Sequence, residues 1–268
     1  MTTLSTLEDT IVFADPYIAP SPQTGAALVT GAAHRLGRAL AEDLARAGWP
    51  VVLHYNGSQD AVKRLRDHIR TGGGTAEIVC GNLLDEAEAS SLLERASGML
   101  GPIGLLINNA SVFEWDDAAS ATPESFALHM DLHLRAPLIM CQKFVELLPE
   151  HQSGLIVNML DSRVLNPTPR HMTYTLSKSG LWTLTRTLAQ ELAPRIRVNA
   201  IGPGPTLPPK GQTIEEFRER CSRLPLQRPA SLSEVCQALR FLVSQKAMTG
   251  QIIALDGGDH LVGHQPQI

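Results

Sequence analysis

Seven short apolar runs alternate with segments of helical length, and this alternation constrains the fold of the 268-residue chain more than any other feature. The runs span residues 26–30, 51–54, 76–80, 103–108, 154–159, 196–201 and 251–255. Amphipathic stretches such as 35–47 and 59–71 lie between them and end near glycines. Strands that alternate with helices predict a parallel sheet covered on both faces. We therefore expect an α/β fold, a single doubly wound Rossmann domain with a seven-stranded parallel sheet.

Composition narrows the function further. The net charge of −4 gives no global basic field, so we expect no nucleic-acid partner. No run of eighteen apolar residues occurs, and the first residues lack the pattern of a secretory signal, so no membrane association is predicted. The four cysteines show no C-x-x-C spacing, which is typical of reduced thiols in a cytoplasmic protein.

The chain is expected to divide into an N-terminal extension, residues 1–24, and the Rossmann domain, residues 25–268. Pro16, Pro20 and Pro22 lie in the first segment, which has no clear periodicity. We expect it to be either loose or packed on the domain as a surface strap.

The segment TGAAHRLG, residues 30–37, follows the first apolar run and opens the first amphipathic stretch. Gly31 allows a tight turn that brings the backbone close to a ligand. The helix behind it presents free N–H groups and a positive dipole end to a diphosphate. A strand, a glycine turn and a helix in this order predict a dinucleotide site, although an ordinary strand–helix turn is the alternative.

This turn resembles the signature T-G-x-x-x-G-x-G of the short-chain dehydrogenase/reductase family. Thr30, Gly31 and Gly37 match, and Arg35 replaces the middle glycine. The pteridine reductase branch makes the same replacement and follows it with Leu or Ile, here Leu36. The resemblance covers about residues 25–262. It implies that the arginine lies beside the cofactor diphosphate and also directs its planar head to a flat heterocyclic substrate.

The stretch after the second run predicts NADPH as the cofactor. It reads HYNGS and lacks the acid that usually holds the ribose hydroxyls of NAD. A ribose phosphate would be tolerated there, although His54 could simply end a strand. The resembling branch has an arginine where this chain has Gly57, which implies weaker phosphate binding. The residues expected to bind the cofactor here and around the adenine are His54, Tyr55, Asn56, Ser58, Asn82 and Leu83.

The fourth and sixth runs are followed by two more segments that resemble the family. Asn108–Ser111 resembles N-N-A-G, so Asn109, Ala110 and Ser111 are expected beside the cofactor. Ser111 and Phe113 are expected to contact a pterin, with a plain core role as the alternative for the phenyl ring. Pro203 and Gly204 are expected beside the nicotinamide, and residues 207–213 to begin a loop that covers the substrate.

Tyr174 and Lys178 form the motif Y-x-x-x-K, whose ends share one helical face. The ammonium group is expected to lower the pKa of the phenol and make it a better proton shuttle. The resemblance implies that the lysine also holds the nicotinamide ribose. Neither of the other two tyrosines has a lysine four residues later.

Asp161 stands thirteen residues before the tyrosine, where most of the family has a serine and the pteridine reductases have an aspartate. A carboxylate would repel a developing alkoxide but could accept ring N–H groups of a pterin or relay a proton. Ser162 would restore a serine after a shift of one residue, and a helix cap is the structural alternative for the acid. His133 replaces a family asparagine that supports a proton path, and we do not count it as catalytic.

The sequence thus predicts an NADPH-dependent pteridine reductase that reduces a dihydropterin of the dihydrobiopterin or dihydromonapterin type, or dihydrofolate. Tyr174, Lys178 and Asp161 are the expected catalytic residues, and Arg35, Ser111, Phe113, Asp161 and Tyr174 the expected substrate contacts. No metal site is expected. A carbonyl or 3-oxoacyl reductase and a non-catalytic NADP(H)-binding sensor are the alternatives. The resemblance also implies a homotetramer formed through residues 123–147 and 173–192.

Overall fold

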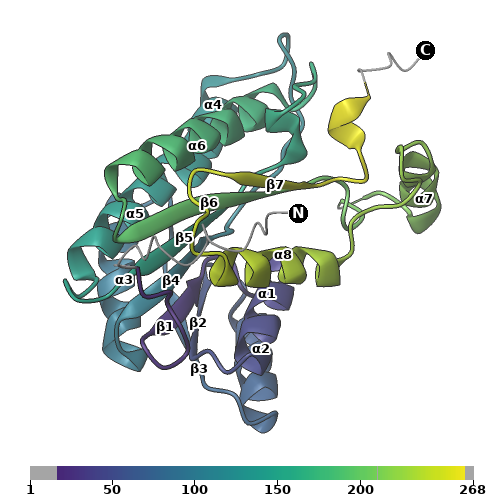
Figure 1. The fold of residues 1–268 in the computed structure, drawn as a ribbon. Coiled ribbons are helices and arrows are strands. Elements are labelled where there is room, and N and C mark those ends of the chain that lie inside the picture. The colour runs from purple at the N-terminus through teal and green to yellow at the C-terminus, as the bar shows by residue number, and fades with distance from the viewer. Residues whose placement is uncertain (1–16, 210, 263–268) are drawn as a thin grey trace, which may run out of the picture.

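The computed structural model describes residues 17–209 and 211–262. Within them seven strands form one parallel sheet in the order β3-β2-β1-β4-β5-β6-β7, which confirms the predicted fold class (Figure 1). The strands are β1 (Ala26–Val29), β2 (Val51–Tyr55), β3 (Ala76–Cys80), β4 (Ile103–Asn108), β5 (Gly154–Met159), β6 (Ile196–Pro203) and β7 (Ile252–Leu255).

The helices cover both faces of this sheet. Helices α1 (Arg35–Arg46), α2 (Gln59–Thr71) and α8 (Leu232–Ser244) pack on one face through one apolar cluster. Helices α3 (Glu86–Leu100), α5 (Ala136–Leu147) and α6 (Met172–Glu191) pack on the other through a second cluster. Figure 1 shows the two groups on opposite sides of the strands. The strand order reverses between β1 and β4, and a ligand in such a sheet binds at that point, beyond the carboxyl ends.

Alternation along the central strands supplies the two clusters. In β4, Leu105 and Ile107 join the first cluster, whereas Ile103 and Leu106 join the second. All six residues of this strand are buried. Side chains of successive strand residues point to opposite faces, so a strand buried on both sides reads as a continuous apolar run. This is why the runs located the strands within one or two residues.

Side-chain caps fix the starts of α3, α4 (Pro123–Met130), α7 (Ile214–Ser222) and α8. Asp85 caps α3, and Thr122 caps α4 with a capping box. Thr213 and Ser231 form capping boxes at α7 and α8. These oxygens accept hydrogen bonds from N–H groups that the first helical turn leaves unpaired. Helices α1 and α2 have no side-chain cap, and both begin at the carboxyl edge of the sheet.

Two further elements shape the region beyond that edge. A π-helical turn, η1 (Asp131–Arg135), joins α4 to α5 and widens the helix where it passes α6. Helix α7 stands away from the sheet, beyond the ends of β6 and β7 (Figure 1). It follows the proline-rich stretch that the sequence predicts to cover a substrate.

The described part of the N-terminal extension packs against the opposite, amino-terminal end of the sheet. Tyr17 is buried, and its hydroxyl donates to the carbonyl of Gly154 at the start of β5 (3.2 Å). Arg197 of β6 lies over the Tyr17 ring at 4.9 Å from the centroid. Of the two alternatives for the extension, the surface strap holds for residues 17–24, while residues 1–16 lie outside the described residues.

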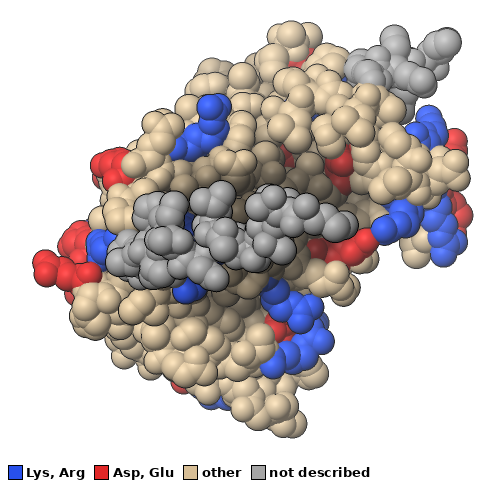
Figure 2. All heavy atoms as spheres, in the orientation of Figure 1, with Lys and Arg blue, Asp and Glu red and all other residues tan. Residues whose placement is uncertain are grey.

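Charge is dispersed over the surface. Figure 2 shows Lys and Arg in small separate groups on the face it presents, several of them beside Asp or Glu. Pairs such as Arg38 with Glu42 and Arg228 with Glu234 account for part of this mixing. No helix among the described residues is long and apolar enough to cross a membrane.

Candidate active site

A cavity of about 960 Å³ lies beyond the carboxyl ends of the strands. Every residue that the sequence predicts for the cofactor, the substrate or catalysis lines this cavity. They come from the turns after β1, β2, β3, β4, β5 and β6 and from α6. No group of three or more His, Cys, Asp or Glu among the described residues is arranged to hold a metal ion.

The turn after β1 is held by the residues that the motif predicts. Thr30 Oγ1 accepts hydrogen bonds from the N–H groups of Asn109 (2.8 Å) and Ala110 (2.9 Å). The Asn109 amide donates to the Thr30 carbonyl (2.8 Å), so this side chain supports the turn. Gly31 has a φ of +64°, and a Cβ at Gly37 would lie 2.2 Å from the Gly31 carbonyl oxygen. Both glycines are therefore required by the backbone.

Arg35 occupies a left-handed backbone conformation, with φ of 51°. Its guanidinium donates to the carbonyls of Pro208 (2.9 Å) and Leu207 (3.2 Å), in the stretch between β6 and α7. The arginine that replaces a glycine thus ties the cofactor turn to the segment on the opposite rim of the cavity. The sequence indicated a cleft-facing head, and this tether is an additional role.

The sequence predicts that His54 binds the cofactor, but its ring is not available to donate to a ribose phosphate. The side chain is buried, its Nδ1 accepts from the Gly31 N–H (3.1 Å), and its Nε2 lies 3.0 Å from the Gly81 carbonyl. Both ring nitrogens are therefore used by the backbone. Burial lowers the pKa of this histidine to about 4, so the ring is neutral near pH 7. His54 holds the glycine turn instead.

The neighbouring residues leave room for a ligand. Ser58 is the N-cap residue of α2 and makes no capping hydrogen bond, and a Cβ at Gly57 would meet no atom within 4 Å. The side-chain oxygen of Asn82 accepts a hydrogen bond from the Leu84 N–H (3.1 Å). Asn82 and the buried Leu83 both line the cavity.

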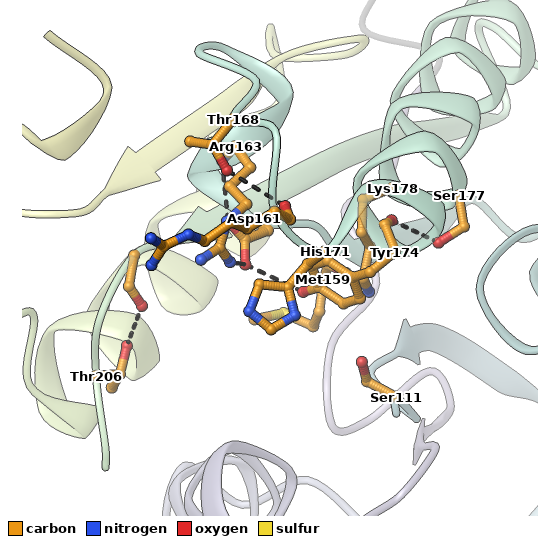
Figure 3. Close-up of polar contacts among 12 residues, drawn as sticks. Ser111, Met159, Asp161, Arg163, Thr168, His171, Tyr174, Ser177, Lys178 and Thr206 are labelled. Carbon is orange, nitrogen blue, oxygen red and sulfur yellow. Dashed lines mark hydrogen bonds and ion pairs between the residues drawn. The ribbon is translucent and has the colours of Figure 1, made fainter. Parts of the chain in front are cut away.

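Tyr174 and Asp161 are in direct contact. The phenol donates to Asp161 Oδ2 at 3.1 Å, and Figure 3 shows the two side chains close together near Lys178. Asp161 also caps the short 3₁₀ helix η2 (Ser162–Val164) by accepting from the Arg163 N–H (2.9 Å). The structural alternative for the acid, a cap, therefore coexists with a contact to the tyrosine. Ser162 is buried in η2, and no contact joins it to the phenol.

The expected lowering of the Tyr174 pKa is wrong. Burial raises the pKa of the phenol well above 10, and the negative charge of Asp161 raises it further. Lys178 donates to the Met159 carbonyl (2.8 Å) and lies 5.8 Å from the centre of the tyrosine ring, whereas the Asp161 carboxylate is hydrogen-bonded to the phenol itself. Burial lowers the pKa of the ammonium group to about 8. Tyr174 is consequently a protonated donor.

Phe113 lies in the cavity with 42% of its surface exposed, so a plain core role does not hold. Its ring stacks on His171 (4.0 Å between centroids) and meets the Tyr174 ring edge-on at 4.8 Å. Arg163 lies 5.2 Å from the Phe113 centroid. An aromatic platform therefore adjoins the tyrosine–aspartate pair.

Several residues that line the cavity carry no signal in the sequence motifs. Arg163 pairs with Asp161 at 3.4 Å, and His171 holds the Glu114 carbonyl through Nδ1 (2.8 Å). Neither belongs to a motif, and the φ of 55° at His171 has no signature in the sequence. Trp115 and Arg220 also line the cavity. Arg163 and His171 lie between β5 and α6, and Trp115 lies between β4 and α4; patterns of strands and helices do not place the side chains of such connections.

Comparison with known proteins gives the family. The family model described as enoyl-(acyl carrier protein) reductase, a short-chain dehydrogenase/reductase model, matches residues 31–260. The chain is a short-chain dehydrogenase/reductase. Curated relatives of this reductase include 3-oxoacyl-(acyl-carrier-protein) reductase FabG of Staphylococcus aureus, which is 28% identical over 89% of this chain and 99% of that protein. The uncharacterized oxidoreductase YjdA of Bacillus subtilis is 32% identical over 87% of this chain and 95% of its own length.

Solved structures similar to this short-chain dehydrogenase/reductase include FolM alternative dihydrofolate reductase 1 from Brucella suis in complex with NADP. It has a TM-score of 0.88 and 45% identity, covering 92% of this chain and 99% of that one. A blue fluorescent protein from a metagenomic library in complex with NADPH has a TM-score of 0.81 and 27% identity, covering 87% of this chain and 97% of that one.

Proposed function

We propose that this short-chain dehydrogenase/reductase is an NADPH-dependent pteridine reductase that converts a dihydropterin, or dihydrofolate, to the tetrahydro form. The observation that carries this proposal is the contact between Asp161 and Tyr174. A carboxylate at this position suits a nitrogen heterocycle, which offers N–H groups and takes up a proton on nitrogen. The 45% identity to an alternative dihydrofolate reductase supports the same substrate class.

The residues present fit NADPH. Gly31 and Gly37 line the cavity, and a Cβ at either would lie within 3 Å of neighbouring backbone, so only glycine allows this close turn at the cavity wall. Helices α1 and α2 begin at the cavity without side-chain caps; α5 and α6 also lack one, whereas α3, α4, α7 and α8 have them. Free N–H groups at such helix starts bind phosphates. Similar solved structures hold NADP or NADPH.

The chain's own residues would hold the substrate and its proton. When bound, NADPH supplies the hydride that adds to a pterin ring carbon, and a proton adds to the adjacent ring nitrogen. Tyr174 stays protonated because burial and Asp161 raise its pKa, so it is suited to donate that proton. Asp161 accepts hydrogen bonds from the pterin edge, Phe113 covers a face of the ring, and Lys178 orients the nicotinamide ribose.

Reduction of a 3-oxoacyl thioester or another carbonyl is the second candidate, because several relatives bear the FabG name. Such a reaction develops negative charge on oxygen and needs a neutral donor beside the tyrosine. Asp161 occupies that place, and Ser162 lies in η2 without a contact to the phenol. This geometry favours the pterin.

The test is a comparison of substrates and of two tyrosine variants. The wild type is expected to oxidise NADPH with dihydrobiopterin, dihydromonapterin or dihydrofolate, and not with 3-oxoacyl thioesters. Tyr174→Phe should lower kcat by about 10²- to 10⁴-fold with NADPH binding retained. Tyr17→Phe, which removes a buried hydroxyl at the opposite end of the sheet, should leave kcat unchanged. Full turnover in Tyr174→Phe would contradict the assigned chemistry, and retained biological activity without turnover would favour the sensor.

We also propose a homotetramer formed through the helices within residues 123–147 and 173–192. Leu138 and Leu176 are exposed apolar side chains on these helices, 36% and 51% accessible. Light scattering should give four times the chain mass of 29.0 kDa. A monomeric mass would contradict this assembly.

A further inference from the structure

Two buried histidines lie one helical turn apart beside the active site, and the reaction described above does not use them. His129 is in the last turn of α4 and His133 is in η1, with 0% and 1% of their surfaces exposed. Each side chain bridges the same two parts of the molecule. One part is the segment 111–116 after β4, and the other is helix α6, which carries Tyr174.

The hydrogen bonds of His133 define its tautomer. The Val112 N–H donates to Nε2 at 3.1 Å, and an N–H group cannot accept, so Nε2 carries the lone pair. The proton of the neutral ring is therefore on Nδ1, which donates to Ser177 Oγ at 2.9 Å. Ser177 in turn donates to the carbonyl of Tyr174 (2.7 Å). Ser111 Oγ also lies 3.0 Å from Nε2.

His129 repeats this arrangement one turn earlier. The Glu114 N–H donates to Nε2 at 3.4 Å, and Nδ1 donates to Thr173 Oγ1 at 2.7 Å. The Thr173 hydroxyl donates a hydrogen bond to the carboxylate of Asp116, which lies in the same segment, 111–116. In both bridges the backbone N–H, the imidazole and the hydroxyl of α6 form a chain of hydrogen bonds that runs in one consistent direction.

The two imidazoles also form part of the wall around the tyrosine ring. Their centroids lie 5.9 Å (His129) and 5.3 Å (His133) from that of Tyr174, at interplanar angles of 79° and 89°. These are edge-to-face contacts of the kind that stabilise aromatic pairs. Both histidines therefore contact the segment, α6 and the tyrosine itself.

We propose that His129 and His133 are positioning residues, which lock the segment 111–116 onto the helix that carries Tyr174. Ser111 and Phe113 lie on this segment and face the cavity, so the pair fixes the distance between the substrate platform and the proton donor. The link to substrate binding rests on the proposed function, whereas the mechanical lock does not. Loss of either bridge would release the platform without removing a reacting group.

The lock needs both rings in the neutral state, because a proton on Nε2 would face a backbone N–H. Burial lowers the pKa of both histidines, and the ammonium group of Lys178 acts in the same direction. The carboxylates of Asp116 and Glu114 oppose this shift at His129. The environment therefore keeps the rings neutral near pH 7, as the hydrogen-bond directions require.

The test uses His129→Leu and His133→Leu, which remove both ring nitrogens, with His129→Gln and His133→Gln as conservative variants that keep an acceptor. Thr185→Ala is the matched control. Thr185 is equally buried on α6, and its hydroxyl makes two hydrogen bonds, but these reach Leu181 and Asn158 rather than the segment. Thermal unfolding of each variant reports whether the fold is retained.

Hydrogen exchange of the Val112 and Glu114 amides is the first measurement. Each leucine variant should raise exchange of its own partner amide by about 10- to 100-fold, and each glutamine variant by much less. In steady-state assays the KM for dihydropterin should rise at least about fivefold, with the KM for NADPH changed less than about twofold.

Unchanged exchange of both amides in the leucine variants would overturn the lock, and so would an equal effect of Thr185→Ala. If a leucine variant does not fold, the glutamine variant provides the test. Its side-chain oxygen should accept the hydrogen bond from the amide of the segment and keep the exchange of that amide slow. A wild-type protein that reduces no dihydropterin would contradict the proposed function, but the exchange result would still decide the inference.

Discussion

Replacing Arg35 by glycine separates the backbone role of this residue from the role of its guanidinium. Its φ of 51° is a conformation that glycine adopts without strain and that costs other residues about 1 kcal/mol. The two hydrogen bonds to the carbonyls of Leu207 and Pro208 are exposed, and each contributes about 0.5–1.5 kcal/mol. Strain relief and lost hydrogen bonds therefore nearly offset each other.

The free energy of unfolding of Arg35→Gly should thus change by less than about 1–2 kcal/mol, a shift in Tm of no more than about 4–8 °C. The functional effect should be larger, because the variant loses the tether of the 207–208 segment and the planar donor at the cavity. We expect the KM for dihydropterin to rise by about 10- to 100-fold and the KM for NADPH to change less than about threefold.

The assay is NADPH oxidation over a range of dihydropterin concentrations, with calorimetric Tm values for the same samples. Arg38→Ala is the matched control, since it removes from the same helix an exposed guanidinium whose ion pair is with the half-buried Glu42. An unchanged KM for dihydropterin in Arg35→Gly would refute the substrate role. A fall in Tm above about 10 °C would show that the residue is structural.

Three further predictions follow from single positions. Gly57→Arg should lower the KM for NADPH relative to that for NADH, because its guanidinium would enter open space beside α2, where it can pair with the ribose phosphate. Gly98→Arg, on the exposed face of α3, is the control and should leave this ratio unchanged; an unchanged ratio in Gly57→Arg would count against phosphate binding beside α2. The pKa of His54 is lowered from 6.5 to about 4 in the folded protein, so neutral His54 stabilises the fold above pH 6.5, and roughly 3 kcal/mol of the free energy of unfolding is lost as the pH falls from 6.5 to 4. Urea unfolding of His54→Gln should show a smaller loss of stability over this pH range, and an equal loss would contradict this. Tyr17→Phe should lower the free energy of unfolding by about 1 kcal/mol, because the hydroxyl loses its bond to Gly154; no change by urea unfolding would show that the bond contributes nothing.

The fold was predictable because both of its determinants are local in the sequence. Continuous apolar runs such as 103–108 become strands buried on both faces, and Gly31 and Gly37 mark the turn where side chains do not fit. The Y-x-x-x-K motif placed Tyr174 and Lys178 correctly for the same reason, since helical spacing fixes both on one face.

The electrostatics of the site were not predictable from those motifs. A motif shows which groups are near in the chain, whereas a pKa depends on the nearest charge and on burial. Asp161 follows β5 and accepts a hydrogen bond from the phenol, so burial together with this carboxylate raises the pKa of Tyr174 rather than lowering it. The structural role of His54 was not visible in its own stretch of sequence, because its two backbone partners, Gly31 and Gly81, lie on other turns of the fold.

The most direct test of the account is the rate of NADPH oxidation by the wild-type protein with a dihydropterin and with a 3-oxoacyl thioester, measured side by side with an Asp161→Ser variant. We expect the wild type to turn over the dihydropterin only, and Asp161→Ser to lose that turnover. Turnover of the thioester by the wild type, with the dihydropterin left unchanged, would contradict it.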